Sequence, residues 1–187
     1  MRAATVKGQG AGGGGRDAAA EARPASVDAL VSEIKSRMRS DWPAAVYRER
    51  VLPTRTRSHA VPAAGRNAPV EVQHTLLGIE LKVGRKRVSC PDYATARYLS
   101  VFARLGVTQV AVPYDITKIS ALADDLESAC QRVLLLAGHL TEGRGAAFGS
   151  RVRAAALREA RREVEEAGAG AAVPQFKQST RQRPQRI

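Results

Sequence analysis

The chain has 187 residues, 44% of them apolar, and a formal net charge of +12 at pH 7. This length fits one domain with flanking tails, and two cysteines without CxxC spacing exclude a disulfide-stabilised secreted scaffold. Because no apolar run reaches the length of a bilayer span, we expect no membrane partner and a cytoplasmic protein.

The N-terminal third combines a low-complexity tail, one clear helix and a basic loop. Residues 1–25 are rich in Gly and Ala and are predicted to be disordered. Ser26 is suited to cap a helix whose apolar residues follow at helical spacing until Pro43 ends it. Residues 44–52 fit either a strand or a continued helix. Residues 53–69 contain three prolines and no acid, which predicts an extended basic loop.

The strongest strand signal begins at Val70. From there to Val83 apolar residues alternate with polar or small ones, which is the period of a strand. Gly78 and residues 84–86 are the expected turns or bulges, and Val88 is expected on a short return strand.

Two helices and one further strand are predicted next. Ser89 and Asp92 have capping-box spacing, so a helix is expected from there to about Leu105, with Gly106 as its C-terminal cap. Residues 107–112 are mostly apolar and predict an interior strand. Asp115 or Thr117 can cap the following helix, which should end near His139.

Together these patterns predict an α/β (or α+β) fold: a small sheet of three to four strands packed by helices, in the order α-(β)-β-β-α-β-α. We expect a single core domain over residues 26–140. The disordered tail 1–25 precedes it. A linker plus a separate Ala/Arg/Glu helix (141–168) and a disordered basic tail (169–187) follow it.

The positive charge is segregated along the chain. Residues 70–142 are neutral, with eight basic and eight acidic side chains. The other 22 basic and 10 acidic residues lie in 1–69 and 143–187 and supply the whole charge of +12. A neutral core with basic flanks is typical of a domain that presents cations to a polyanion. A GC-rich genome is the alternative source of so much arginine.

Three acid-free basic stretches are candidate phosphate contacts: the loop before Val70, the expected hairpin tip after Gly84, and the C-terminal tail. The residues expected to contact DNA or RNA are Arg55, Arg57, Arg85, Lys86, Arg87, Lys177, Arg181, Arg183 and Arg186. The alternative for the hairpin tip is a solvated turn. No aromatic residues interleave with these cations, because Tyr93, Tyr98 and Phe102 fit the core better, so nothing here indicates base stacking.

One pattern has a catalytic character. On a strand, Glu80 and Lys82 point to one face while Leu81 points into the core. A metal-dependent nuclease uses a carboxylate to hold a divalent cation and an ammonium group to steady the hydroxide or the phosphate. The alternative is an ordinary pair of cross-strand charges on a solvated strand face.

The order of elements from residue 71 to 113 resembles the PD-(D/E)XK nuclease superfamily, in particular its VRR-NUC domains. The resemblance implies that Glu80 is a metal ligand, that Lys82 is the catalytic lysine and that Mg²⁺ or Mn²⁺ is the cofactor. The family's acid on the preceding strand has Glu71 as its nearest analogue, which would make Glu71 and Glu80 the metal ligands. Glu33 on the first helix could match the family's helical acid.

The sequence therefore favours non-catalytic binding to nucleic acid through phosphates, with low sequence specificity and no cofactor. One alternative is the PD-(D/E)XK-like nuclease. Another is an interaction scaffold that forms a homodimer through an apolar stripe on the helix at 116–139. Cys90 and Cys130 are expected to be reduced core residues.

Overall fold

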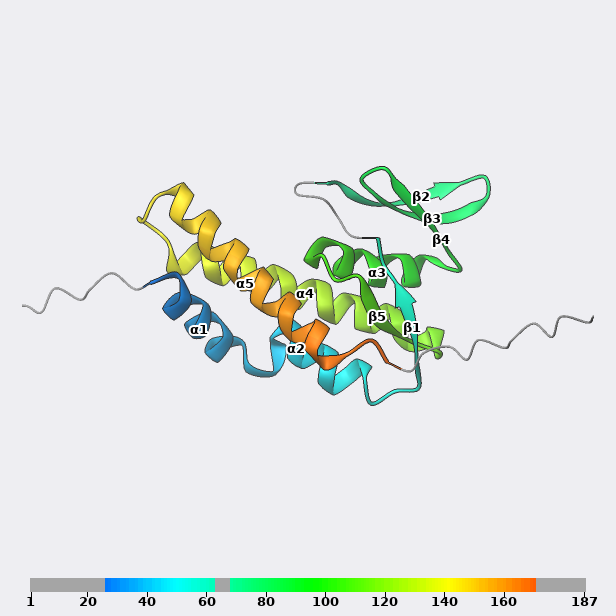
Figure 1. Cartoon of the computed structure of the whole chain (residues 1–187), viewed down its shortest axis with the longest axis horizontal. Coiled ribbons are helices and arrows are strands. Elements are labelled where there is room, and N and C mark those ends of the chain that lie inside the picture. Colours follow the sequence, from blue (N-terminus) through cyan, green and yellow to red (C-terminus); the bar gives the residue numbers. More distant parts are fainter. Residues whose placement is uncertain (1–25, 63–67, 171–187) are drawn as a thin grey trace, which may run out of the picture.

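The computed structural model describes residues 26–62 and 68–170 (Figure 1). The helices are α1 (Val27–Met38), α2 (Pro43–Val46), α3 (Tyr93–Leu105), α4 (Ile116–Leu140) and α5 (Ala146–Ala167), with a 3₁₀ turn η1 (Arg39–Asp41) and a π-helical turn η2 (Tyr47–Val51). The strands are β1 (Thr56–Ala60), β2 (Val70–Thr75), β3 (Gly78–Val83), β4 (Lys86–Cys90) and β5 (Gln109–Pro113). The predicted mixed α/β fold is confirmed.

The strands form two separate antiparallel sheets. One is the meander β2–β3–β4, and the other pairs β1 with β5. The prediction of one sheet was wrong in this respect: the apolar run at 107–112 does form a buried strand, but its partner is β1. That partner lies within the segment predicted to be a loop, and Arg57 stands opposite Val112 in the register.

Two tyrosine hydroxyls explain why β5 does not join the meander. The backbone N–H of Ala111 donates to the Tyr47 hydroxyl at 2.8 Å, and the Tyr98 hydroxyl donates to the Ala111 carbonyl at 2.7 Å. Both groups point away from β1, toward the edge where another strand would pair. Because buried backbone groups need partners, the two hydroxyls satisfy this edge and close it to a further strand.

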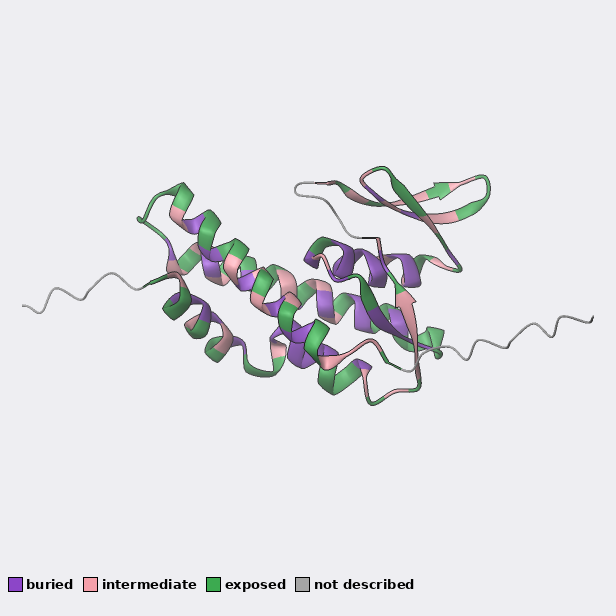
Figure 2. Cartoon of the chain, in the orientation of Figure 1, coloured by how far each residue is buried: buried purple, intermediate pink, exposed green. Residues whose placement is uncertain are grey.

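The elements are stacked in layers (Figure 1). The meander covers α3, α3 packs against α4, and α5 packs on the other side of α4 together with α1 and α2. Leu81 and Val83 on β3 are buried, and the meander packs on α3. Figure 2 shows that α2, α3 and β5 are mostly buried, whereas the meander is mostly exposed or intermediate.

Local sequence signals explain most helix ends. Ser26 Oγ accepts from Ala29 N at 3.2 Å, and Asp115 caps α4 by accepting from Thr117 N, so both predicted caps are confirmed. Gly106 ends α3 with φ +82°, as predicted. Ser89 was the wrong cap for α3: it lies in β4, and Asp92 accepts from Thr95 N at 2.7 Å instead.

Two helical segments differ from the sequence expectation. Pro43 was expected to end the first helix, but α1 already ends at Met38. Pro43 instead stands at the first position of α2, where its missing N–H costs nothing. Residues 44–52 are helical. The apolar stripe of α5 is fully buried, although the sequence predicts a separate helix outside the core domain. Its members are Val152, Ala156, Ala160 and Val164.

Candidate nucleic-acid interface

Two arginines and a tyrosine meet where β1 begins and β5 ends. Arg55 and Arg57 are two residues apart on an extended segment, so they point to the same face. Tyr114 follows β5 and its N–H donates to the Arg55 carbonyl at 3.0 Å. The guanidinium carbons of Arg55 and Arg57 lie 5.2 and 5.8 Å from the centre of the Tyr114 ring. We call these three residues the Arg–Tyr cluster.

The positive charge of the Arg–Tyr cluster is not neutralised within the described part of the chain. Neither arginine forms an ion pair there, and Arg57 Nε is buried without a hydrogen-bond partner. The acid next in sequence, Asp115, is engaged elsewhere: it accepts from Thr117 Oγ1 at 2.6 Å and lies 3.7 Å from Lys118 Nζ. The hydrogen bond from Thr117 lowers the pKa of Asp115, so this carboxylate stays charged and bound at the start of α4.

The last described residues run close to β1. The Tyr47 hydroxyl donates to the Gly168 carbonyl at 2.8 Å and so holds the end of α5 near β5. Gly170 then passes so close to β1 that a Cβ there would lie 2.5 Å from Thr56 Oγ1, on the face of the strand opposite Arg55 and Arg57, and its φ of +75° also favours glycine. The four predicted cations that follow lie outside the described residues: Lys177, Arg181, Arg183 and Arg186.

The second basic stretch, at the turn between β3 and β4, lies apart from the Arg–Tyr cluster. In Figure 1 this turn is on the upper side of the molecule, while β1 begins near the lower side. Arg85, Lys86 and Arg87 are exposed. Arg87 pairs with Glu80 at 3.3 Å, whereas no ion pair within residues 26–62 and 68–170 involves Arg85 or Lys86.

Glu71, Glu80 and Lys82 form a ladder of charges on one face of the meander. Glu71 stands directly opposite Lys82, and their charged atoms are 3.4 Å apart. Glu80 stands opposite Gln73, so the two carboxylates are diagonal neighbours, and Glu80 has its own cation in Arg87. Paired in this way, they are arranged as cross-strand ion pairs.

Among the residues that the structure describes, no group of three His, Cys, Asp or Glu side chains could hold a metal ion. Glu33, which could match the helical acid of the nuclease superfamily that the sequence resembles, pairs with Arg37 on α1. The nuclease site stays a prediction from the resemblance.

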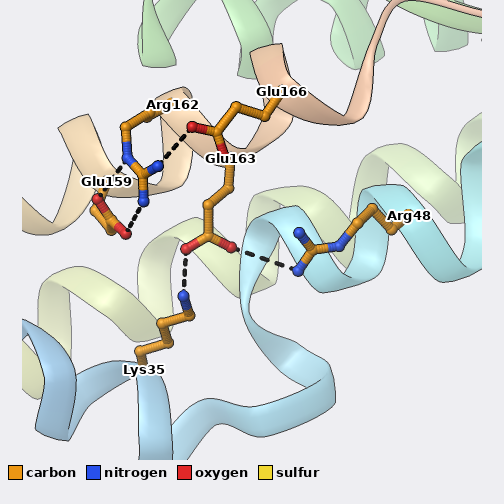
Figure 3. A network of polar contacts seen from close by, with 6 residues as sticks. All are labelled: Lys35, Arg48, Glu159, Arg162, Glu163 and Glu166. Carbon is orange, nitrogen blue, oxygen red and sulfur yellow. Dashed lines mark hydrogen bonds and ion pairs between the residues drawn. The ribbon is translucent and has the colours of Figure 1, made fainter.

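The buried carboxylate of Glu163 on α5 is surrounded by partners of opposite charge (Figure 3), unlike the arginines of the Arg–Tyr cluster. The Glu163 side chain is only 5% exposed, and it contacts Lys35 of α1 at 2.5 Å and Arg48 of η2 at 3.4 Å. On the outer side of the same helix, Arg162 pairs with Glu159 at 2.6 Å and with Glu166 at 2.5 Å. The arginines and glutamates of α5 drawn in Figure 3 are thus bound to neighbours within the fold.

The cysteines show no sign of reactivity. Cys90 and Cys130 are both free, Cys90 is buried and Cys130 packs against the core. Burial raises the pKa of the Cys130 thiol to about 12, so it stays protonated at neutral pH.

Sequence reasoning missed the aromatic part of the cluster. Tyr114 is 48% exposed, and Tyr93, which was assigned to the core, is 49% exposed and stacks on His74. Tyr98 and Phe102 are buried, as predicted. One signal could have found Tyr114: it stands between a buried strand and the helix cap Asp115, at a chain position that is normally at the surface.

Comparisons with family models, curated proteins and solved structures gave no match to this chain. None of the helices in the described ranges is both long and apolar enough to cross a bilayer. The function is therefore inferred from the residues themselves.

Proposed function

We propose that this protein binds nucleic acid, DNA or RNA, through its phosphates, with little sequence specificity and without catalysis. One observation carries the proposal. Arg55 and Arg57 form a cluster with Tyr114 and have no acidic partner among the described residues. The residues after Gly170 contain four cations and no acid, and Gly170 itself packs on the other face of the same strand, against Thr56. Unpaired cations in the fold and a basic sequence that follows it suit a flexible polyanion.

The pairing of the other charges supports this choice. Arg161 and Arg162 on α5 are bound to glutamates of the same helix, so they are already neutralised before any ligand arrives. Arg55 and Arg57 have no acid paired with them in residues 26–62 and 68–170, so a phosphate could be their counterion. Arg85 and Lys86 are a second pair of cations without an ion pair in the same ranges, on the far side of α3, that a long strand could reach.

The test is a binding titration with oligonucleotides over a range of salt concentrations. If about four phosphates are contacted, affinity for a single strand should fall about 50-fold between about 50 and about 200 mM salt. The double variant Arg55→Ala/Arg57→Ala should reduce the slope of log K against log salt by about 1.4, and deletion of residues 171–187 should reduce it further.

Arg161→Ala/Arg162→Ala is the matched control, because it removes the same charge from paired positions. Its salt slope should equal that of the wild type. No binding at low salt, or binding that ignores salt, would rule the proposal out. An equal loss in both double variants would show that net charge alone is responsible.

The same titration with Mg²⁺ or Mn²⁺ separates binding from the nuclease alternative. The proposal expects intact oligonucleotide. Cleavage that depends on the metal and disappears in Glu80→Ala would instead support the nuclease that the resemblance implies.

Two further predictions, on oligomeric state and location, are proposed with it. Leu134 and Leu135 on α4 are exposed and could form part of a homodimer interface. The mass in solution tests this: two chains would support the scaffold alternative, and one chain would count against it. The two free thiols support a reducing, cytoplasmic location.

A further inference from the structure

Tyr114 presents part of its aromatic surface to solvent beside arginines that have no acidic partner among the described residues. About half of the residue is exposed, at 48%, whereas Tyr98 and Phe102 are completely buried. Two guanidinium groups lie over its ring, 5.2 and 5.8 Å from the ring centre. Aromatic rings and guanidinium planes are the surfaces on which unpaired bases stack.

We infer that Tyr114 stacks an unpaired nucleobase while Arg55 and Arg57 bind the neighbouring phosphates, so that the protein prefers single-stranded to duplex nucleic acid. This inference rests on the proposed function and adds to it the class of nucleic acid. Stacking is tolerant of sequence, because every base has a π face, so it agrees with low specificity.

The backbone that carries the Tyr114 ring is fixed on both sides. The backbone N–H of Tyr114 donates to the Arg55 carbonyl, and the next residue, Asp115, caps α4. A backbone anchored in this way loses little conformational entropy when a base stacks on the ring, which favours binding.

Helix α5 is the arginine-rich element that a duplex groove would have to accept. A duplex covers the faces of its bases, so a protein reads it with a cationic helix or strand in a groove. The apolar stripe of α5 is buried and Arg161 and Arg162 are paired with glutamates, so only Arg151, Arg153 and Arg158 of its arginines are without an ion pair among the described residues. Exposed Ile116, which follows Asp115, adds apolar surface next to Tyr114, and such surface suits a base better than a backbone.

The first test uses the wild-type protein and three fluorescent ligands of about 12 nucleotides: a single strand, the duplex of the same sequence, and a strand of the same length without bases. The single strand should bind about tenfold more tightly than the baseless strand, which has the same phosphates. It should also bind more tightly than the duplex at equal salt.

The second test changes the ring. Tyr114→Leu should weaken single-strand binding about tenfold, to the level of the baseless strand, and leave the salt slope unchanged because no phosphate contact is lost. Tyr114→Phe keeps the aromatic face and should bind like the wild type. Tyr93→Leu is the matched control: it removes an equally exposed tyrosine from the meander side, and its affinity should not change.

The outcomes separate this inference from the proposed function. If binding depends on salt but the duplex or the baseless strand binds as well as the single strand, the stacking inference fails and phosphate binding stands. The same holds if Tyr114→Leu binds like the wild type. If no ligand binds at low salt, the proposed function itself fails. A thermal melt of each variant confirms that it is folded.

Discussion

The Glu163 network on the helical side and the Arg–Tyr cluster at the end of β1 hold charge in opposite ways. Glu163 is buried and is contacted by cations from two other elements, α1 and η2 (Figure 3). Arg55 and Arg57 lie near one another at the surface, contact an aromatic ring and have no acid paired with them in the described residues. Both regions are rich in charge, yet of the two only the Arg–Tyr cluster has cations without an acidic partner among the described residues.

This contrast teaches that the number of arginines is a weaker guide than their pairing. Helix α5 has more arginines than the loop that holds Arg55 and Arg57, but its Arg161 and Arg162 are matched by glutamates within one helical turn. Because an ion pair must be broken before a phosphate can take the place of its acid, paired arginines contribute less to binding. Four experiments test the contrast, in order of decreasing effect.

The largest effect is expected from Glu163→Ala. It leaves Lys35 and Arg48 without their carboxylate, and breaking a buried pair usually costs 3–5 kcal/mol. Here both cations are almost half exposed, at 44% and 47%, and can regain water. We therefore expect the free energy of unfolding to fall by about 2 kcal/mol. Urea unfolding measures it, and oligonucleotide affinity should not change.

Glu166→Ala is the control, since Glu166 is on the same helix but exposed. It should leave the unfolding midpoint nearly unchanged. If the two variants were equally stable, burial would not distinguish the two kinds of charge, and the contrast would be lost.

A smaller loss of stability is expected from Tyr47→Phe. Tyr47 links the helical side to β5 through its hydroxyl. The hydroxyl accepts from Ala111 N and donates to the Gly168 carbonyl, and both bonds are lost without a change in ring packing. A buried N–H left without a partner costs about 1–3 kcal/mol, and we expect a loss of about 1.5 kcal/mol in urea unfolding. Tyr93→Phe, at an exposed position, should be neutral. If Tyr47→Phe were as stable as the wild type, the hydroxyl would not hold the β5 edge.

A pH dependence should follow from Glu127, another bound charge on the helical side. Burial raises its pKa, but hydrogen bonds from Arg97 and Arg104 outweigh burial and lower it below the ordinary value. Glu127 therefore adds stability above its unfolded pKa of about 4.3, and this stability is lost as the pH falls through the lower folded pKa. The free energy of unfolding of the wild type should exceed that of Glu127→Gln by about 0.5 kcal/mol near neutral pH.

The check is urea unfolding of both proteins from about pH 7 to about pH 3. The difference between them should close as the solution becomes acidic. If the stability difference between the two proteins widened on acidification, the pKa of Glu127 would not be lowered by folding. Glu142→Gln, an exposed acid in the loop after α4, should follow the wild type at every pH.

Signals that depend on a few neighbouring residues could be predicted from the sequence. The caps Ser26, Gly106 and Asp115 and the alternating strand at Val70–Val83 all belong to this kind, because each depends on hydrogen bonds or burial within one turn or one strand. The Arg–Tyr cluster was half predicted for the same reason. Arg55 and Arg57 stood out as an acid-free stretch, but their ring came from Tyr114, far along the chain.

What the sequence could not reveal depends on long-range contacts. The separation of β5 from the meander depends on hydroxyls of Tyr47 and Tyr98, which no periodicity records. The thin stripe of α5 was underestimated because small residues such as Ala156 and Ala160 bury little area each. They do allow close approach of neighbouring helices, and that approach is decided by packing.

The smallest effect, and the finest test of the contrast, is expected from Glu80→Gln. Glu80 holds Arg87 at 3.3 Å, and the Arg87 side chain is 59% exposed whereas that of Glu80 is 18% exposed. Because solvent reaches the arginine, the pair is worth about 0.3 kcal/mol and stability should hardly change. The substitution nevertheless frees a third cation beside Arg85 and Lys86. If unpaired charge is what binds phosphate, affinity for a long single strand should rise about twofold, with a steeper salt dependence.

Glu142→Gln makes the same change in net charge in the loop between α4 and α5 and should give no increase. An equal increase in both variants would mean that overall charge, rather than the pairing of individual arginines, governs binding.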